Sequence, residues 1–356
     1  MSKYILYDEV CDYKNLKAGY YQTQIAGRKY RKESVIFDMA REKNMAALWK
    51  SLKNGTYCPG EYIQFQVYEP KQRLVSAPRI RDKIVQHTVH KVLWRLYEPA
   101  FIKDSYACME NRGSHQAVER VQHFMKKCAW QNADSWILKM DIRKFFYSID
   151  HNVLKAILRK KIRDEKFLHL LDMIIDSNPE GSIGLPLGNV TSQDMANIYL
   201  NELDQYAKRF LHIKYYVRYM DDIIIVCESR EQAKRYRQEI DVFLKNRLRL
   251  DLNEKTKIFP IAQGVNAYGY KIYTTHKHVR DSSKRAMKRR MKAMDAKVKA
   301  GDMRRKDVQK SVNSWLGHAR HSNSYNLSRK IFGRYKYIKI EHPDYRFGKQ
   351  PLKTPK

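Results

Sequence analysis

Residues 215–226 read YYVRYMDDIIIV, and this stretch constrains the fold more than any other part of the sequence. Residues that favour strands stand on both sides of two adjacent acids, Asp221 and Asp222. A strand interior disfavours aspartate, and neighbouring like charges repel. The pattern therefore predicts a β-hairpin that holds both carboxylates at its tip, although such a pair alone is more often a solvated turn than a binding site.

A third acid stands at the end of another predicted strand. The segment SWILKMDI, residues 135–142, is short and apolar and contains Asp141 near its end. If the two strands are neighbours, Asp141 joins Asp221 and Asp222 in a cluster of oxygen ligands, which hard divalent cations prefer. Two such ions about 3.5–4 Å apart stabilise the attacking and leaving oxygens in phosphoryl transfer. They would also relieve the repulsion between the adjacent aspartates.

The other segments alternate between helical and strand patterns. Strands are expected in EYIQFQVYEP and RLVSA, on either side of a turn at Pro70-Lys71-Gln72, and near KTKIFP and AYGYKIY. Helices are expected in FDMAREKNMAALWKSLKNG, which ends at Gly55, and in DKIVQHTVHKVLWRLYEPAF, VLKAILRKK, DMANIYLNELDQYAKRF and REQAKRYRQEIDVFLKNRL, with IGLPLGNVTSQ as a loop. Mixed elements with antiparallel hairpins predict an α+β fold.

The charge balance indicates a polyanionic partner. The chain has 70 Lys and Arg against 38 Asp and Glu, a formal net charge of +32. A membrane surface is the rival partner, but the sequence has no long apolar segment, and its start, MSKYILYDEV, lacks the apolar core of a signal peptide. The five cysteines are scattered without C-x-x-C pairs, which argues against a disulfide framework or a cysteine zinc site. We therefore expect a cytoplasmic protein.

Residues 284–306 form a strongly basic segment, with eleven Lys and Arg and two Asp. Met287, Met291, Met294 and Val298 follow helical spacing, which predicts one apolar stripe on a helix. The stripe is interpreted as a packing face. The basic face is either a solvated surface or, as the local charge favours, a surface that contacts phosphates.

Several segments over about residues 60–275 resemble, in the same order, the motifs of reverse transcriptases. The fingers motif resembles VYEPKQRLVSAPRIRDKIVQ, the strand with the first catalytic aspartate resembles KMDIRKFF, and the following loop and helix resemble GLPLGNVTSQDMANIYLNELD. YMDD comes next, then LDLNEKTKI, and then YGYKIY at the place of the family's primer-grip hairpin.

The resemblance implies a right-hand polymerase with fingers, an antiparallel palm and a small helical thumb. It divides the chain into N-terminal helices and fingers (1–134), palm (135–274, with a fingers insertion at about 160–183), basic helical thumb (275–340) and tail (341–356). The implied reaction is DNA synthesis from dNTPs on an RNA template. The implied partners are that template, a DNA or RNA primer, a structured non-coding RNA and a basic accessory protein oligomer, with no membrane.

The resemblance also assigns the carboxylates. Asp141 and Asp221 would bridge two Mg²⁺ ions, with Mn²⁺ as an alternative, and Asp222 would be a partial ligand near the primer end. The backbone carbonyl of Ile142 would add an oxygen.

Other residues match positions that contact the incoming nucleotide. Lys71 and Arg73 would grip the triphosphate, and Phe146 would exclude ribonucleotides by a clash at the 2′ position. Lys255 would lie near the pyrophosphate. The simpler alternatives are a solvated turn for Lys71, a core position for Phe146 and an exposed side chain for Lys255. Before Gly188, Leu187 stands where the family has a glutamine that can hydrogen-bond the incoming nucleotide. Because leucine cannot make this contact, we expect weaker selection of the correct nucleotide.

Further residues match positions that contact nucleic acid in the family. They lie in the Gly/Pro loop, the hairpin with the two acids, the primer-grip hairpin and the basic segment: Gly184, Pro186, Tyr219, Tyr268, Gly269, Lys284, Lys288, Arg289 and Lys292. The histidine pairs His276/His278 and His318/His321 are interpreted as packing or nucleic-acid contacts.

The loop points to a subgroup. Its L-G-x-x-x-S-Q pattern, residues 187–193, is similar to reverse transcriptases of diversity-generating retroelements, as are the short fingers turn and SWLGHARHSNSYNL. Two alternatives stay open. One is a bacterial defence reverse transcriptase with its own non-coding RNA template, and the other is a non-catalytic RNA-binding scaffold, against which the intact acids argue.

Overall fold

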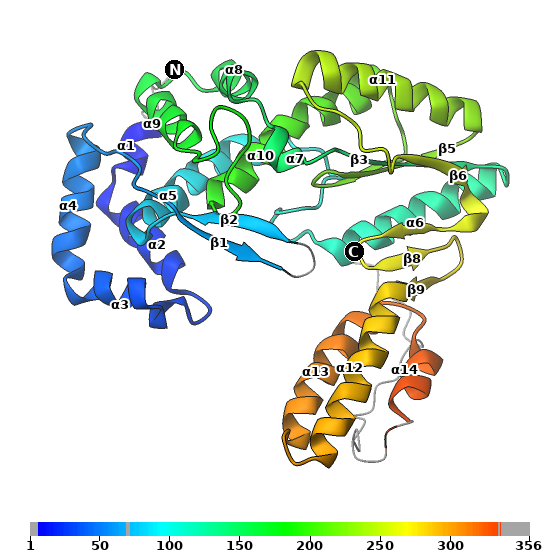
Figure 1. The fold of residues 1–356 in the computed structure, drawn as a ribbon. Helices are drawn as coiled ribbons and strands as arrows, with labels where there is room; N and C mark the ends of the chain where they lie inside the picture. Colours follow the sequence, from blue (N-terminus) through cyan, green and yellow to red (C-terminus); the bar gives the residue numbers. More distant parts are fainter. Residues whose placement is uncertain (1–5, 69–71, 334, 336–356) are drawn as a thin grey trace. The chain divides into compact units, whose positions relative to one another are not determined.

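The computed structural model describes residues 6–68, 72–333 and 335 of the 356-residue chain (Figure 1). Its elements are mixed helices and strands with antiparallel pairs, as the sequence predicts. They group into two compact units. The first consists of Met1–Glu110, Met140–Ile223 and Arg235–Thr256, and the second of Asn111–Lys139, Ile224–Lys234 and Lys257–Lys356.

Helices dominate the first unit, and α5 (Ile80–Tyr97) supplies much of its core. The side chains of Ile84, Val89 and Leu93 on this helix are fully buried. Helix α2 (Tyr13–Gln24) packs so closely on α5 that a Cβ atom at Gly19 would lie 2.7 Å from the carbonyl oxygen of Ile84. The other α-helices of this unit are α1 (Leu6–Val10), α2 (Tyr13–Gln24), α3 (Lys32–Met39), α4 (Arg41–Lys53), α7 (Phe145–Ser148), α8 (His151–Lys161), α9 (Glu165–Asp176) and α10 (Val190–Gln205).

Some helix boundaries of this unit differ from the sequence-based expectation. The helix expected over 37–55 is two helices, α3 and α4, because the backbone of Ala40 leaves the helical region (φ −133°, ψ 39°). Helix α10 begins at Val190 inside the expected loop, after Asn189 in an extended conformation. The predicted stop at Gly55 is confirmed, since this glycine follows α4 with a positive φ of 67°.

A hairpin of β1 (Ile63–Val67) and β2 (Arg73–Ala77) matches the two strands expected there. The strands pair antiparallel, with Ile63 opposite Ala77 and Val67 opposite Arg73. The expected turn between them falls largely on residues 69–71, which lie outside the described residues.

The largest sheet has four strands in the order β4-β5-β3-β6. The strands are β3 (Trp136–Asp141), β4 (Tyr216–Tyr219), β5 (Asp222–Cys227) and β6 (Lys257–Pro260), and β3 pairs antiparallel with β6. Five consecutive residues of β5, from Ile223 to Cys227, are buried, which explains the uninterrupted apolar run after the two acids. Helix α11 (Arg230–Leu248) follows β5.

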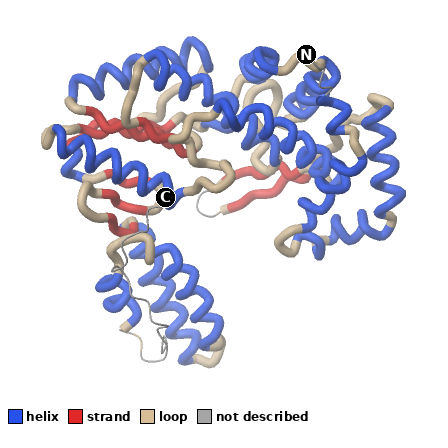
Figure 2. The backbone as a smooth tube through the Cα atoms, turned by 180° about the vertical axis from the view of Figure 1, so that it is seen from behind, coloured by secondary structure: helices blue, strands red, loops and turns tan. Residues whose placement is uncertain are grey.

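The second unit combines a three-stranded sheet with helices. Strands β7 (Val265–Ala267), β8 (Tyr270–Ile272) and β9 (Lys277–Val279) pair antiparallel, and α6 (Ser114–Gln131) belongs to this unit. Helices α12 (Asp281–Lys299), α13 (Arg305–Ala319) and α14 (Tyr325–Phe332) lie side by side (Figures 1 and 2).

A small core joins the helices α12, α13 and α14. Met287, Met291 and Met294 are buried in it and Val298 packs against it, so the predicted apolar stripe is confirmed. The expectation of a single helix over 284–306 is wrong, because α12 ends at Lys299 before Gly301, whose φ is +82°, and α13 starts at Arg305. In the part of the chain that the structure describes, every helix is too short or too polar to cross a lipid bilayer.

Candidate active site

The β4–β5 hairpin holds the two adjacent acids at its tip, as expected. Strand β4 ends at Tyr219, β5 begins at Asp222, and Met220 between them adopts a left-handed conformation with φ +54°. Strand β3, which ends on Asp141, is the neighbour of β5 in the sheet. The condition that the sequence left open is met, because the two acid-bearing strands are adjacent.

The electrostatics show that the three carboxylates share one environment. Burial is the largest cause that raises the pKa of Asp221 from 3.8 to about 6; the negative charges of Asp141 and Asp222 also contribute to this rise, and Arg73 opposes it. Like charges that sit close together in a partly buried place disfavour ionisation. The surroundings of Asp221 therefore disfavour its negative charge, which a bound cation would stabilise.

Asn253 holds the first of these acids in place. Its side-chain Nδ2 donates to Oδ2 of Asp141 at 2.9 Å, and its backbone N–H donates to the carbonyl oxygen of Asp141 at 2.7 Å. Beside this contact, Ile142 forms an antiparallel bridge with Leu252. The LDLN segment thus positions the end of β3, a role that the sequence analysis did not assign to Asn253.

The carboxylates of Asp141, Asp221 and Asp222 fit a hard divalent ion by their chemistry, because such ions prefer oxygen ligands. The raised pKa of Asp221 shows that its surroundings disfavour its negative charge, which a cation would stabilise. Within residues 6–68, 72–333 and 335, however, no three His, Cys, Asp or Glu side chains are arranged as a ready metal-binding group. Ile142, the expected carbonyl ligand, is buried at the end of β3. Metal binding at these residues is therefore part of the functional proposal below.

The adjacent residues Phe145 and Phe146 differ in burial. The side chain of Phe145 is buried with 2% exposed, whereas Phe146 is half-buried. The carbonyl oxygen of Phe146 accepts a hydrogen bond from the N–H of Leu185 at 2.7 Å. A Cβ atom at Gly184, whose φ is +90°, would lie 3.1 Å from Cα of Tyr147. The Gly/Pro loop therefore lies directly against α7.

The same loop also contacts the β1–β2 hairpin. The N–H of Ser76 donates to the carbonyl oxygen of Leu187 at 2.9 Å, and a Cβ atom at Gly188 would lie 2.7 Å from the carbonyl oxygen of Ser76. Pro186 closes the loop by accepting from the Ser192 hydroxyl at 2.9 Å. Leu187 is thereby placed beside β2, the strand that begins with the exposed Arg73.

Three further residues of the first unit were predicted to contact the nucleotide or the nucleic acid: Lys71, Lys255 and Tyr219. Lys71 lies outside the described residues. Lys255 is exposed, and its backbone N–H donates to Oδ1 of Asn253 at 3.1 Å. Tyr219 is half-buried at the end of β4, and burial raises the pKa of its hydroxyl.

The predicted nucleic-acid contacts of the second unit lie on a turn and on α12. Tyr268 and Gly269 connect β7 and β8 with φ values of +49° and +94°, and a Cβ atom at Gly269 would lie 2.8 Å from Cε1 of His318. On α12, Lys284 forms an ion pair with Asp281 at 3.0 Å. The exposed cations of this helix include Lys288, Arg289 and Lys292.

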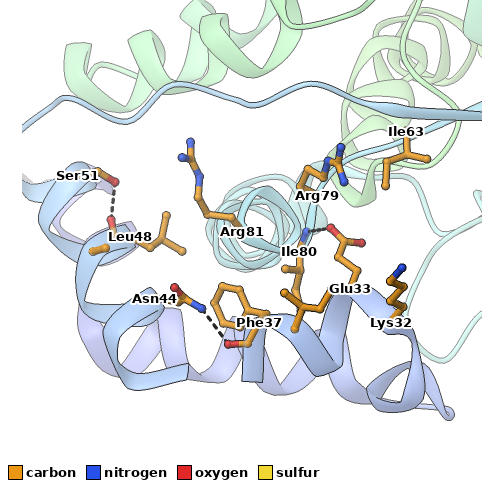
Figure 3. A pocket seen from close by; sticks show the side chains of 12 residues that line it. Lys32, Glu33, Phe37, Asn44, Leu48, Ser51, Ile63, Arg79, Ile80 and Arg81 are labelled. Carbon is orange, nitrogen blue, oxygen red and sulfur yellow. Dashed lines mark hydrogen bonds between the residues drawn. The ribbon is translucent and has the colours of Figure 1, made fainter. Parts of the chain in front are cut away.

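A separate pocket of about 770 Å³ in the first unit contains none of the predicted site residues (Figure 3). Apolar side chains such as Phe37 and Ile80 line it together with Arg79 and Arg81. Glu33 also lines the pocket, and its side chain accepts a hydrogen bond at 2.6 Å from the N–H of Ile80 at the start of α5. This pocket is therefore separate from the three carboxylates.

Fold and site together define an α+β protein with an acidic site suited to cations on a sheet with antiparallel pairing. The chain belongs to the reverse transcriptase (RNA-dependent DNA polymerase) family, whose model matches residues 66–314. This membership and the observed α+β elements confirm the expected right-hand polymerase fold.

Individual relatives are distant. The chain is 27% identical to the protein YkfC of Escherichia coli over 58% of this chain and 66% of that protein. It is 24% identical to the group II intron-encoded protein LtrA of Lactococcus lactis over 71% of this chain and 54% of that protein. Apo telomerase from Candida tropicalis aligns with a TM-score of 0.49 and 12% identity, covering 77% of this chain and 58% of that one. The chain thus spans between half and two thirds of the curated relatives named here.

Proposed function

We propose that this protein synthesises DNA on an RNA template, adding deoxynucleotides to a primer 3′ hydroxyl and releasing pyrophosphate. The observation that carries the proposal is that β3 and β5 are adjacent, so that the charges of Asp141 and Asp222 act on Asp221 and contribute to its raised pKa. Membership of the reverse transcriptase family gives this cluster a reaction. A basic chain with a net charge of +32 suits a polyanionic template and primer.

The acids would hold Mg²⁺, or Mn²⁺ as an alternative, through Asp141, Asp221 and the carbonyl of Ile142, with Asp222 nearest the primer end. The bound ions would supply charge stabilisation for the attacking and leaving oxygens. Asn253 keeps the carboxylate of Asp141 in its orientation through the hydrogen bond at 2.9 Å. Held in this way, the carboxylate loses less freedom on binding.

The incoming dNTP would lie between the β1–β2 hairpin, α7 and the Gly/Pro loop, which contacts both of them. Arg73, together with Lys71, would bind the triphosphate, because a guanidinium matches phosphate geometry and stays charged. Phe146 would stand against the 2′ position, a role supported by its half-buried side chain next to the fully packed Phe145. Leu187 and Gly188 would contact the nascent base pair, and Lys255 would lie near the leaving pyrophosphate.

The template and primer would lie along the loop, the hairpins and the basic helix. The contacts proposed in the first unit are Gly184, Pro186 and Tyr219, and those in the second are Tyr268, Gly269 and cations of α12. We further propose the division into fingers (1–134), palm (135–274) and thumb (275–340) implied by the family pattern. The exposure of Lys288, Arg289 and Lys292 supports the role of α12.

The finer proposal is an error-prone reverse transcriptase of a diversity-generating retroelement. The pattern at residues 187–193, in which Leu187 stands where a hydrogen-bonding glutamine is usual, supports it. Sequencing the RNA that co-purifies with the protein tests it. A transcript that contains a template repeat, matched by a variable repeat in a neighbouring gene, is expected. An RNA without any such repeat pair would instead favour a role in defence.

Primer extension tests the activity itself. The purified protein, with Mg²⁺, dNTPs and a primed RNA template, should extend the primer. Asp221→Asn should reduce extension to background, because the side chain keeps its size but loses the charge that binds cations. Asp241→Asn, at a half-buried aspartate on α11 that pairs with Lys245, is the matched control and should extend normally. Extension by Asp221→Asn at the wild-type rate would contradict the assignment of this site.

A further inference from the structure

Arg218 is a buried cation three positions before Asp221, the first of the paired acids. Neither its side chain nor that of Asp204 exposes any surface, and Nη2 of Arg218 lies 2.6 Å from Oδ2 of Asp204. Its Nε donates to Oδ1 of Asp204 at 2.8 Å, which completes a two-point contact. Burying two charges is costly, and the loss of either partner would leave an uncompensated charge in the core, so each of these side chains depends on the position of the other.

The partner residues fix this cation from a rigid helix. Asp204 and Asn197 both lie on α10, seven residues apart and so on one face of the helix. Nη1 of Arg218 donates to Oδ1 of Asn197 at 3.1 Å, and the hydroxyl of Tyr216 donates to Oδ1 of Asp204 at 2.8 Å. Nδ2 of Asn197 in turn donates to the carbonyl oxygen of Ala107 at 3.0 Å.

One arm of the guanidinium reaches the tip of the hairpin. Nη1 of Arg218 also donates to the carbonyl oxygen of Met220 at 3.2 Å. Met220 has a φ of +54°, a left-handed conformation that is unfavourable for a residue with a side chain. The hydrogen bond is made to the peptide group that leads directly into Asp221, so it holds the turn at the residue that precedes the acids.

We propose that Arg218 is a positioning residue: anchored by Asp204 and Asn197, it holds the strained turn at Met220 and thereby places the carboxylates of Asp221 and Asp222. The inference rests on the proposed function for its consequence in catalysis. Its structural content, the fixing of the hairpin tip by a buried cation, does not depend on that function.

The test compares the wild type with Arg218→Lys. Lysine keeps a positive charge beside Asp204 but lacks the planar fork that donates to Asp204, Asn197 and Met220 at once. The matched control is Arg95→Lys, because Arg95 makes a two-point contact with Glu9 at 3.0 and 2.6 Å in the same unit. The two readouts are primer-extension kinetics and amide hydrogen exchange of a peptide that spans residues 215–226.

In Arg218→Lys we expect kcat to fall about tenfold, the scale of one lost hydrogen bond to a charged group. The KM for dNTP should stay close to the wild-type value. Exchange should become faster in the peptide 215–226 and remain unchanged elsewhere, and Arg95→Lys should match the wild type in both readouts. Unchanged exchange in that peptide overturns the proposal, and so does faster exchange with a wild-type kcat.

A second variant covers the case in which Arg218→Lys does not fold. Arg218→Met combined with Asp204→Leu and Tyr216→Phe removes the buried charges together, a change that cores often tolerate. A folded variant with low kcat and faster exchange at the tip supports the proposal, and a normal kcat overturns it. If the wild type makes no DNA while Arg218→Lys still loosens the tip, the proposed function fails and the positioning role stands.

Discussion

The Asp221 carboxyl occupies a place that disfavours its charge. Burial, with the charges of Asp141 and Asp222, raises its pKa to about 6. In the unfolded chain the same group has a pKa near 3.8, so between pH 4 and 6 the folded state binds the additional proton. The stability that this group contributes is therefore present at low pH and is lost as the pH rises through about 6.

This sign gives a prediction for the protein in buffer without divalent ions. Asp221→Asn should be more stable than the wild type at pH 8, by about 2–4 °C in Tm for a gain on the order of 1 kcal/mol. The gain should shrink toward pH 4, where the wild-type carboxyl is protonated. Thermal unfolding at both pH values measures it, with Asp241→Asn as control. A wild type that is the more stable protein at pH 8 would contradict the account of this charge cluster.

Replacing Phe146 by alanine should admit ribonucleotides. Removal of the ring opens space where the 2′-hydroxyl would otherwise clash, so the ratio of rNTP to dNTP incorporation should rise by about tenfold or more, equivalent to roughly 1.4 kcal/mol. Steady-state incorporation of each nucleotide by the purified variant measures this ratio. Phe210→Ala, at an exposed phenylalanine with 70% of its surface accessible, is the control. An unchanged ratio would mean that Phe146 acts only in packing.

Leu187→Gln should make synthesis more accurate. Leucine offers no directional contact to the incoming base pair, and one restored hydrogen bond is worth about 0.5–1.5 kcal/mol, so misincorporation should fall by up to roughly tenfold. Sequencing cDNA made on one RNA template by both proteins measures the change. Ile183→Gln introduces the same side chain at an exposed position of the same loop as control. Equal error spectra, with slower synthesis or lower stability, would show that Leu187 serves only to pack the loop.

Residue by residue, the sequence identified the acids but missed the groups that hold them. Asp141, Asp221 and Asp222 are visible because acids stand out in apolar strands. Asn253 lies 112 positions from Asp141 and was passed over, although its segment was recognised, because its contact is a matter of tertiary structure. Arg218 looked like one basic residue among 70, and only its complete burial shows that it differs from them.

At the scale of elements, α12 gives the clearest prediction. Replacing Lys288, Arg289 and Lys292 by glutamine should weaken RNA binding and lower its salt slope by about 2–3, at about 0.7–0.9 counterions per phosphate contact. Titrations at several salt concentrations measure the slope. The control replaces Lys43, Lys50 and Lys53, three exposed cations of α4, in the same way. If the salt slope falls equally in both variants, the cations of α12 contribute only to the overall positive charge of the protein and make no particular contact with phosphates.

Helices and strands with a clear pattern of apolar residues could be predicted from the sequence, but the residues at which they end could not. The apolar runs of β3 and β5 and the methionine stripe of α12 are found where the pattern placed them. The break between α3 and α4 falls at Ala40, a good helix former, so no local signal marks it. At the end of α12 the signal was present in Gly301, and the basic run across it concealed the boundary.

For the whole molecule, the net charge of +32 and the acidic site make opposite demands. The positive surplus attracts a polyanion over long range, whereas the carboxylates repel its phosphates at the point of chemistry. Divalent ions at Asp141 and Asp221 would reconcile the two. The account therefore requires that nucleic-acid binding survive the loss of Mg²⁺ while synthesis does not.

Template-directed addition of a single nucleotide is the strictest test of RNA-templated DNA synthesis by this protein. Four primed RNA templates that differ only in the first unpaired base are each offered one dNTP at a time with Mg²⁺. The complementary dNTP should be added fastest on every template, with release of one pyrophosphate for each addition, and Asp221→Asn should add none. Addition that ignores the template base, or no addition by the wild type on any template, would contradict the proposed function.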